Sequence, residues 1–260
     1  MSAFGHFCAF CERPLPDKAW VWNARTGECL EEDSRDIQDW QFLYLLDHNC
    51  HKAQQCASAQ GLDPSVLLLP ASESGFTPLL DSPLRYQMQP VERVLVDERG
   101  KKSSETIDQV VVSGITDQAN ATIRYFALNT PYYKSDQNEL EIPLGDYLSL
   151  EDRRMDQRTL VWKNAEMVAL NVRNAETFEL GRVVTEQFRL LAGSMGFWSS
   201  SVTASANILQ NRNMLRRIFF EAAEMAQRRL VIDGLEPGEA VFFHGSGPHH
   251  TFPGTQSVFG

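Results

Sequence analysis

Two groups of cysteines near the start of the chain constrain its fold more than any other feature. Cys8 and Cys11 form a Cys-x2-Cys pair, and a second group follows in the segment LLDHNCHK, which contains Cys50. Thiolate sulfur and imidazole nitrogen are preferred ligands of Zn²⁺, and structural zinc sites are closed, four-coordinate tetrahedra. The spacing therefore predicts that Cys8, Cys11 and Cys50 share one structural zinc ion.

The fourth ligand of this predicted zinc site is open between three residues. Asp47 lies three positions before Cys50, where a second Cys-x2-Cys pair would have its first cysteine. A carboxylate oxygen is an acceptable zinc ligand, so we predict Asp47. His48 and His51 are the alternatives, because each offers an imidazole nitrogen within the same short segment.

Two other interpretations of the cysteines compete with zinc. The cysteines could be incidental buried thiols of a reduced protein, because a single Cys-x2-Cys is common. A redox role is weaker, because no strand precedes the pair and no βαβ unit surrounds it. Cys29 and Cys56 are not expected to be ligands: Cys29 lies in an acidic loop, and Cys56 is off the helical face of Cys50 and His51.

The segment LLDHNCHK carries a family resemblance. It is similar to the closing motif of HNH nucleases, in which a leucine pair precedes Cys-x2-Cys-His and a basic residue; here Asp47 replaces the first cysteine, Cys50 is the second, and His51 is the histidine. The rest of the chain resembles the HNH-family proteins of Septu and retron antiphage systems (PtuB type). Its further matching segments are CAFCE (Cys8 to Glu12), Trp40, LDSPLRYQM (Leu80 to Met88), TIRYFALN (Thr122 to Asn129), an Arg-rich helix start at Asp152, GFWSS (Gly196 to Ser200) and FPGT (Phe252 to Thr255).

This resemblance implies a fold and an activity. It implies a ββα-metal module that cleaves nucleic acid together with an ATPase subunit of a prokaryotic antiphage defence complex. DNA is favoured over RNA as the identity of that nucleic acid, and both stay open. His48 or His51 would bind or position a catalytic Mg²⁺ or Mn²⁺. The chain contains no G-x-x-x-x-G-K-[ST] phosphate loop, so ATP hydrolysis would belong to the partner.

The sequence departs from the HNH pattern at the residues that catalyse. No histidine occurs between Cys11 and Trp40, where such nucleases carry their general base, and the position of the middle asparagine falls near Gln41 or Phe42. Neither side chain can take a proton from water. The alternative function is therefore a catalytically inactive, zinc-stapled adaptor subunit. A third hypothesis, a metalloenzyme built on the late histidines, rests on His244, His249 and His250.

Composition gives two expectations, one about the cellular location of the protein and one about how it would bind nucleic acid. No apolar run approaches the ~20 residues that cross a bilayer, and the first residues do not resemble a signal peptide. Five clustered cysteines favour a reducing, cytoplasmic location over a disulfide framework. The formal net charge of −10 is unfavourable for a protein that binds phosphates alone, so a partner is expected to supply the positive channel.

The order of the elements predicts an α+β fold in three parts. Residues 1–65 form the HNH-like zinc module, with a short strand at Trp20-Val21-Trp22 and a helix over HKAQQCASAQ (51–60) that ends at Gly61. Residues 66–148 form a connecting segment of short β runs, with a helix opening in ANATIRYFALN (119–129).

Residues 149–260 are predicted to be helical up to a Gly, Pro and His-rich tail. One helical pattern begins at Ser149 as N-cap and ends at Gly193, and a second covers 199–230. The expected apolar positions of the first pattern are Leu160, Met167, Leu170, Phe178 and Val184.

Overall fold

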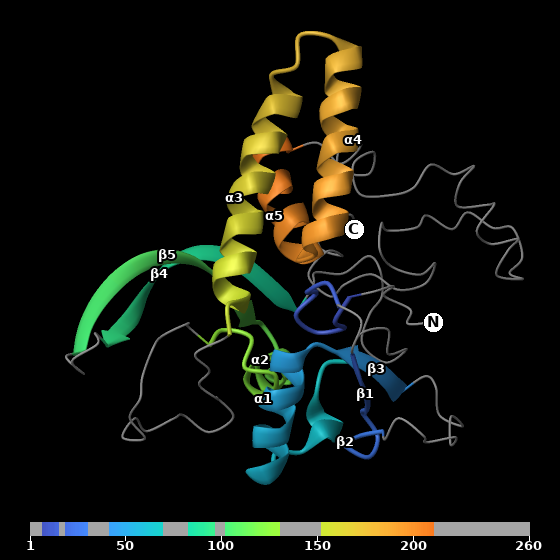
Figure 1. Cartoon of the computed structure of the whole chain (residues 1–260), viewed down its shortest axis with the longest axis vertical. Coiled ribbons are helices and arrows are strands. Elements are labelled where there is room, and N and C mark those ends of the chain that lie inside the picture. Colours follow the sequence, from blue (N-terminus) through green and yellow to red (C-terminus); the bar gives the residue numbers. More distant parts are fainter. Residues whose placement is uncertain are drawn as a thin grey trace, which may run out of the picture. The chain divides into compact units, whose positions relative to one another are not determined.

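The computed structural model describes residues 7–15, 19–30, 42–69, 83–96, 102–130 and 152–210, and it is an α+β fold of small sheets and five α-helices within those ranges (Figure 1). The chain divides into two compact units. Unit 1 comprises Met1–Pro14, Pro70–Ser82 and Val161–Gly260, and unit 2 comprises Leu15–Leu69 and Pro83–Leu160. The predicted division into three parts stays a prediction.

Unit 2 begins with a three-stranded antiparallel sheet. The strands are β1 (Trp20–Asn23), β2 (Glu28–Cys29) and β3 (Leu43–Leu46), in the order β2-β1-β3, with Trp20 opposite Leu46 and Trp22 opposite Cys29. Because the side chains of a strand alternate between two faces, Trp22 points inward while its neighbours are half-buried. The strand expected at Trp20–Trp22 is thus present.

Helix α1 (His48–Ala59) follows β3 after one residue. Asp47 is its N-cap, with an extended backbone and a carboxylate that accepts from the amide of Cys50 at 2.8 Å. At the other end Gly61 has φ +74°, a conformation that glycine adopts without steric cost, and the Leu62 amide returns to the Ala57 carbonyl at 3.0 Å. Gly61 therefore ends the helix as the sequence predicts.

The middle of the chain forms two strands that are longer than predicted. β4 (Leu84–Val96) and β5 (Lys102–Gly114) pair antiparallel over 13 residues each, with Leu84 opposite Gly114. The separate short runs predicted there are one continuous ribbon, because antiparallel pairing extends through the charged residues between the β-branched ones. VLLLP, expected as a strand, contains instead the end of a short 3₁₀-helix, η2 (Pro64–Val66), whose N-cap is Asp63.

Helix α2 (Asp117–Tyr125) lies where ANATIRYFALN predicts a helix, but it stops before the end of that segment. Thr116 caps its first turn by accepting from Ala119 at 3.2 Å. Ala127 has φ +47°, which turns the chain out of the helix. The core of unit 2 is an aromatic cluster centred on the fully buried Trp22, whose ring lies 5.4 Å from Phe126 and 6.0 Å from Tyr125.

The single long helix predicted after Ser149 is two helices, α3 (Arg154–Arg173) and α4 (Phe178–Met195), so that prediction is wrong. Ser149 lies outside the described residues, and the carboxylate of Asp152 instead accepts from the Arg154 amide at 3.0 Å. The helix breaks at Asn174–Thr177, where the Thr177 hydroxyl accepts from Leu180 at 3.2 Å to start α4. Gly193, the predicted end, lies inside α4.

The predicted apolar face of α3 is also wrong. Leu160 and Met167 are 53% and 56% exposed. The buried side of α3 within unit 1 carries smaller residues beside one tryptophan: Val161, Trp162, Ala165, Ala169 and Val172. Small side chains permit close packing against neighbouring helices, and they carry a weaker periodic signal than the larger residues on the exposed side.

Helix α5 (Trp198–Leu209) ends earlier than the second predicted pattern, because Gln210 adopts a left-handed conformation at φ +49°. Residues beyond 210, the histidines of the tail among them, lie outside the described part. Among the described helices, none is both long enough and apolar enough to cross a membrane.

Candidate metal centre

The first half of the candidate centre is a tight turn, the knuckle, which we define as residues 7–14. Phe7 and Pro14 form an isolated β-bridge, and the Cys8 amide donates to the Arg13 carbonyl at 2.9 Å. The Glu12 amide returns to the Cys8 carbonyl at 3.0 Å, so the chain reverses between the two cysteines. Cys8 is fully buried and Cys11 is 5% exposed.

The knuckle is fastened to helix α5 within unit 1 by Glu12. This residue has φ +63° and is 2% exposed, and its carboxylate accepts from the amide of Ser199 at 2.7 Å and from the Ser199 hydroxyl. The N-cap of α5, Phe197, makes no side-chain cap bond, while its amide donates to the Glu12 carbonyl at 2.9 Å. Glu12 therefore caps α5 from 187 positions away, and its negative charge suits a helix N-terminus.

Gly196 allows this approach. It has φ +70°, and a Cβ built at this position would lie 2.2 Å from the Glu12 carbonyl oxygen. The ring of Phe7 also packs edge-on against Trp198, with centroids 5.8 Å apart. The segment GFWSS thus supplies the bare backbone, the aromatic partner and the capped amide that hold the knuckle.

The second half of the candidate centre, the helix corner, is Asp47 to Cys50 at the start of α1. The side chains of Asp47 and Cys50 are buried, at 3% and 0% exposure. The N-cap bond from Asp47 to the Cys50 amide brings the carboxylate and the thiol to the same end of the helix. The spacing of three residues is thus explained by helix capping, since the N-cap side chain faces the third helical residue.

The structure gathers four ligand atoms from these two halves. The sulfurs of Cys8, Cys11 and Cys50 and a carboxylate oxygen of Asp47 all lie within 4.8 Å of one another, and all four residues are buried. Sulfurs around a tetrahedral zinc with Zn–S of ~2.3 Å lie ~3.8 Å apart, which falls within this limit. Cysteine sulfur and carboxylate oxygen are ligand types that Zn²⁺ accepts, and this group, which we call the metal group, could hold a metal ion.

The two histidines of LLDHNCHK lie outside the metal group. His48 is exposed, and the His51 ring stacks on Trp20 with centroids 4.7 Å apart and planes at 17°. Burial, and secondly the charge of His48, lower the pKa of His51. The catalytic role assigned to His48 and His51 stays a prediction.

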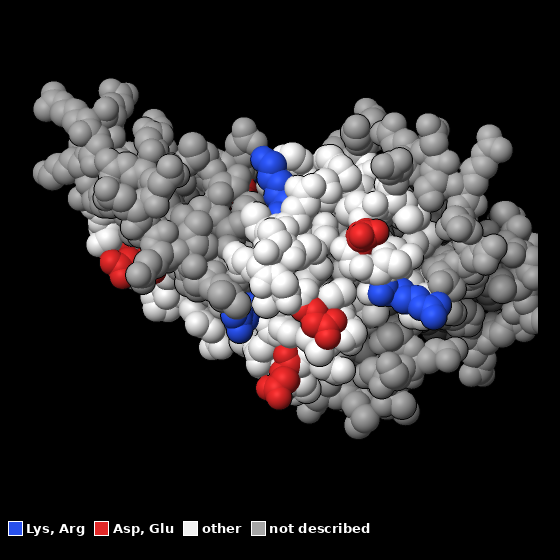
Figure 2. Space-filling view, turned by 90° about the horizontal axis from the view of Figure 1, so that it is seen from below, with Lys and Arg blue, Asp and Glu red and all other residues white. Residues whose placement is uncertain are grey.

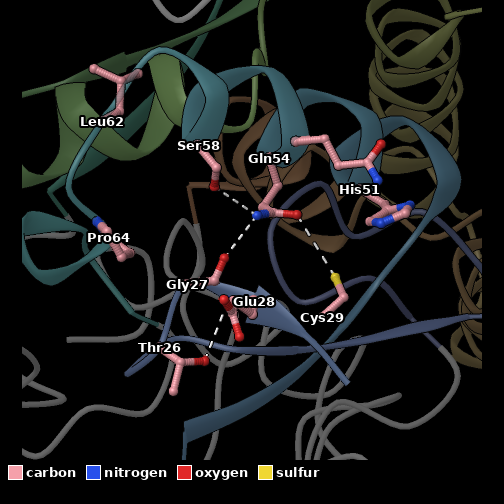
Figure 3. A pocket seen from close by; sticks show the side chains of 10 residues that line it. Thr26, Gly27, Glu28, Cys29, His51, Gln54, Ser58, Leu62 and Pro64 are labelled. Atoms are coloured by element: carbon pink, nitrogen blue, oxygen red, sulfur yellow. Dashed lines mark hydrogen bonds between the residues drawn. The ribbon is translucent and has the colours of Figure 1, made fainter. Parts of the chain in front are cut away.

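An open hollow of about 570 Å³ lies beside His51 in unit 2 (Figure 3). Gln54 stands at its centre: its amide nitrogen donates to the Gly27 carbonyl and to the Ser58 hydroxyl, both at 2.9 Å, and its oxygen accepts from the Cys29 thiol at 3.8 Å. Burial raises the pKa of the Cys29 thiol to about 11. Cys29 is thus a protonated thiol near neutral pH, and it forms no part of the metal group.

Sequence reasoning missed a pair of buried arginines on the first turns of α3. Arg154 and Arg158 are 1% and 2% exposed. Arg158 donates to the Val110 and Leu128 carbonyls at 2.9–3.0 Å, and Arg154 donates to those of Phe126 and Ala127 at 2.9 and 3.1 Å. Three of these four carbonyls lie just beyond the end of α2, and the fourth, that of Val110, belongs to β5, so the two arginines tie the start of α3 to both segments.

The same region explains the segment TIRYFALN. The side chain of Asn129 bonds both backbone groups of Val112, accepting from its amide at 2.9 Å and donating to its carbonyl at 2.6 Å. Thr122 accepts from the Leu68 amide at 2.7 Å. The sequence offered one signal for this region, the Arg-rich start of α3. On a solvated helix these arginines would be exposed, but here Arg154 and Arg158 are buried.

A scan against protein-family models, a search of curated proteins and a search of solved structures each found no match. The site therefore rests on its own residues.

Proposed function

We propose that this chain is a zinc-stapled HNH-like protein that acts on nucleic acid as a subunit of a prokaryotic antiphage complex, with an ATPase subunit as its partner. The observation that carries the proposal is the buried metal group, two of whose ligands begin helix α1 directly after a small antiparallel sheet. Strands leading into a ligand-bearing helix are the arrangement that a ββα-metal module requires. Zinc in the metal group would hold this module together.

In this proposal the reacting groups lie on the exposed side of the same helix start. His51 comes directly after the ligand Cys50 and lines the open hollow, which gives a phosphodiester backbone room beside the imidazole. Trp20 stacks on the ring and holds its orientation. The lowered pKa keeps the imidazole neutral near pH 7, as binding a divalent ion or accepting a proton requires. A bound Mg²⁺ or Mn²⁺ would supply charge stabilisation at the phosphate.

The second candidate is a catalytically inactive adaptor, and charge favours it. On the face that Figure 2 shows, the described Lys and Arg side chains are spread among Asp and Glu and do not gather into a patch. The whole chain carries a formal charge of −10. Since phosphate contacts dominate affinity for nucleic acid, the adaptor would leave nucleic-acid binding to its partner.

One experiment separates the two candidates. The zinc-loaded protein, alone and with the ATPase encoded beside it, is incubated with plasmid DNA in Mg²⁺ or Mn²⁺. The nuclease proposal expects cleavage that His51→Ala abolishes and that Gln118→Ala, an exposed change on α2, leaves intact. Zinc-loaded protein that binds the ATPase but stays inert with every metal, while His48→Ala and His51→Ala keep full antiphage protection, establishes the adaptor.

A further inference from the structure

The metal ligand Cys50 has a neighbour that the sequence does not point to. Nη1 of Arg154 lies 3.1 Å from the Cys50 sulfur, although 104 positions separate the two residues. Both side chains are buried, at 1% and 0% exposure, so water does not compete for the contact. A guanidinium at this distance donates a charge-assisted hydrogen bond to sulfur, and the bond is strongest when the sulfur is a thiolate.

The guanidinium is held in place from its other side. Asp152, which is 1% exposed, accepts from Nε of Arg154 at 3.0 Å and from Nη2 at 2.7 Å, in a two-point contact. The carbonyls of Phe126 and Ala127 accept from Nη1 and Nη2. With these partners fixing the plane of the guanidinium, the direction of its Nη1 toward Cys50 is fixed as well.

A hydrogen-bond donor beside Cys50 would stabilise the negative charge of the zinc-bound metal group. Three thiolates and one carboxylate carry four negative charges against the two positive charges of Zn²⁺. Excess negative charge in a buried site is costly unless hydrogen bonds spread it. Outer partners of metal ligands meet this need in other metal sites, where they orient the ligand and set its basicity.

We propose that Arg154 is a positioning residue of the metal centre, which donates to the Cys50 thiolate and is aimed at it by Asp152. This inference rests on the metal centre of the proposed function and adds a partner to one of its ligands. Lysine cannot replace Arg154, because one ammonium nitrogen cannot reach the sulfur, the two carbonyls and the carboxylate in this planar arrangement.

The test compares Arg154→Lys with Arg158→Lys in the full-length zinc protein. Arg158 lies one turn further along α3, is equally buried, and donates to the carbonyls of Val110 and Leu128, so it is a matched control for burying a lysine. Zinc release to an excess of chelator should be about 10–100-fold faster in Arg154→Lys, because the loss of an outer partner of a ligand typically lowers metal affinity by that factor. Arg158→Lys should release zinc at the wild-type rate.

A second readout is specific to the sulfur. In Co²⁺-substituted protein, a hydrogen bond to the thiolate stabilises its lone pairs, so its loss should move the sulfur-to-cobalt charge-transfer band to lower energy. Arg154→Lys should show this shift and Arg158→Lys should not. Equal release rates and an unchanged band in the two variants would overturn the proposal.

If Arg154→Lys does not fold, Asp152→Asn decides the question with the same two readouts. Asparagine keeps the size of the side chain but removes the charge that aims the guanidinium, so a smaller shift in the same direction is expected, and wild-type behaviour would overturn the proposal. If the purified wild-type protein contains no zinc, the metal centre of the proposed function is wrong. If the wild type contains zinc but no variant changes zinc release or the cobalt band, only the role proposed for Arg154 is wrong.

Discussion

The knuckle and the helix corner contribute two side chains each to the metal group, but they are built in different ways. The corner is local: Asp47 caps α1, and the same bond that starts the helix brings Cys50 to the end where Asp47 lies. The knuckle depends on distant residues: Glu12, at its far end, caps α5 from 187 positions away, and Gly196 leaves room for its carbonyl. A helix start can preorganise a ligand pair without metal, whereas the knuckle needs α5.

The largest expected effect tests whether both halves bind one ion. Cys11→Ser, in the knuckle, and Cys50→Ser, in the corner, should each reduce zinc from about one ion per chain to almost none, because a site that loses a thiolate loses most of its affinity. Elemental analysis of purified protein measures this. Cys29→Ser is the control and should keep its zinc, since Cys29 lies outside the metal group.

The same variants distinguish the two halves by amide exchange. In Cys50→Ser, α1 should stay protected because its N-cap is intact, while exchange in the knuckle becomes faster once no ion holds its turn. Knuckle amides as protected without zinc as with it would show that α5 alone holds the turn.

The next effect probes the dependence of the knuckle on α5. Gly196→Ala should destabilise the protein by about 3 kcal/mol or more, because the new Cβ meets the Glu12 carbonyl in a left-handed backbone. Gly61→Ala is the matched control: it also has positive φ, but nothing lies within 4 Å of its Cβ, so only about 1–2 kcal/mol of backbone strain is expected. Denaturant unfolding of both variants measures the difference, and equal values would contradict the fastening of the knuckle.

A smaller effect separates the two roles of Asp47. Asparagine is as good an N-cap as aspartate but a poor zinc ligand, so Asp47→Asn should keep the stability of apo α1 and lower zinc affinity by about tenfold or more. Asp47→Ala should lose both, with about 1 kcal/mol of extra destabilisation from the missing cap. Zinc titrations and unfolding of the metal-free proteins give the two numbers. Unchanged zinc affinity in Asp47→Asn would remove Asp47 from the ligand set.

The smallest effect concerns Cys29, the thiol that belongs to neither half. Burial raises its pKa to about 11, so the folded protein keeps a proton that the unfolded chain releases at lower pH. The unfolded state then binds fewer protons, and stability should fall as the pH rises between about 9 and 11. Cys29→Ser should flatten this part of the stability curve measured by unfolding at each pH. Tyr44, whose pKa burial raises to about 12, should produce a further fall at higher pH.

Prediction from the sequence succeeded where local signals mark a structure and failed where no such signal is present. The strand at Trp20 and the helix that Gly61 ends follow from spacing and turn chemistry within a few positions. The repeated spacing of three also led to Cys8, Cys11, Asp47 and Cys50, which the structure gathers into one buried group that could hold a metal ion. The break between α3 and α4 was missed, because no glycine or proline marks Asn174–Thr177 and the amphipathic pattern continues through it.

By itself, the sequence determined a pair of cysteines, a second ligand pair at a helix start, and the chemistry that such donors favour. Tertiary structure alone decided which distant groups surround them. Glu12 became the cap of α5, and Arg154 became the partner of Cys50, because packing placed a buried charge where an amide or a thiol needed it. A charged residue in a sequence gives no sign of such burial, since in most proteins it faces water. Only the folded chain supplies the hydrogen-bond partners that offset the free-energy cost of burying the charge.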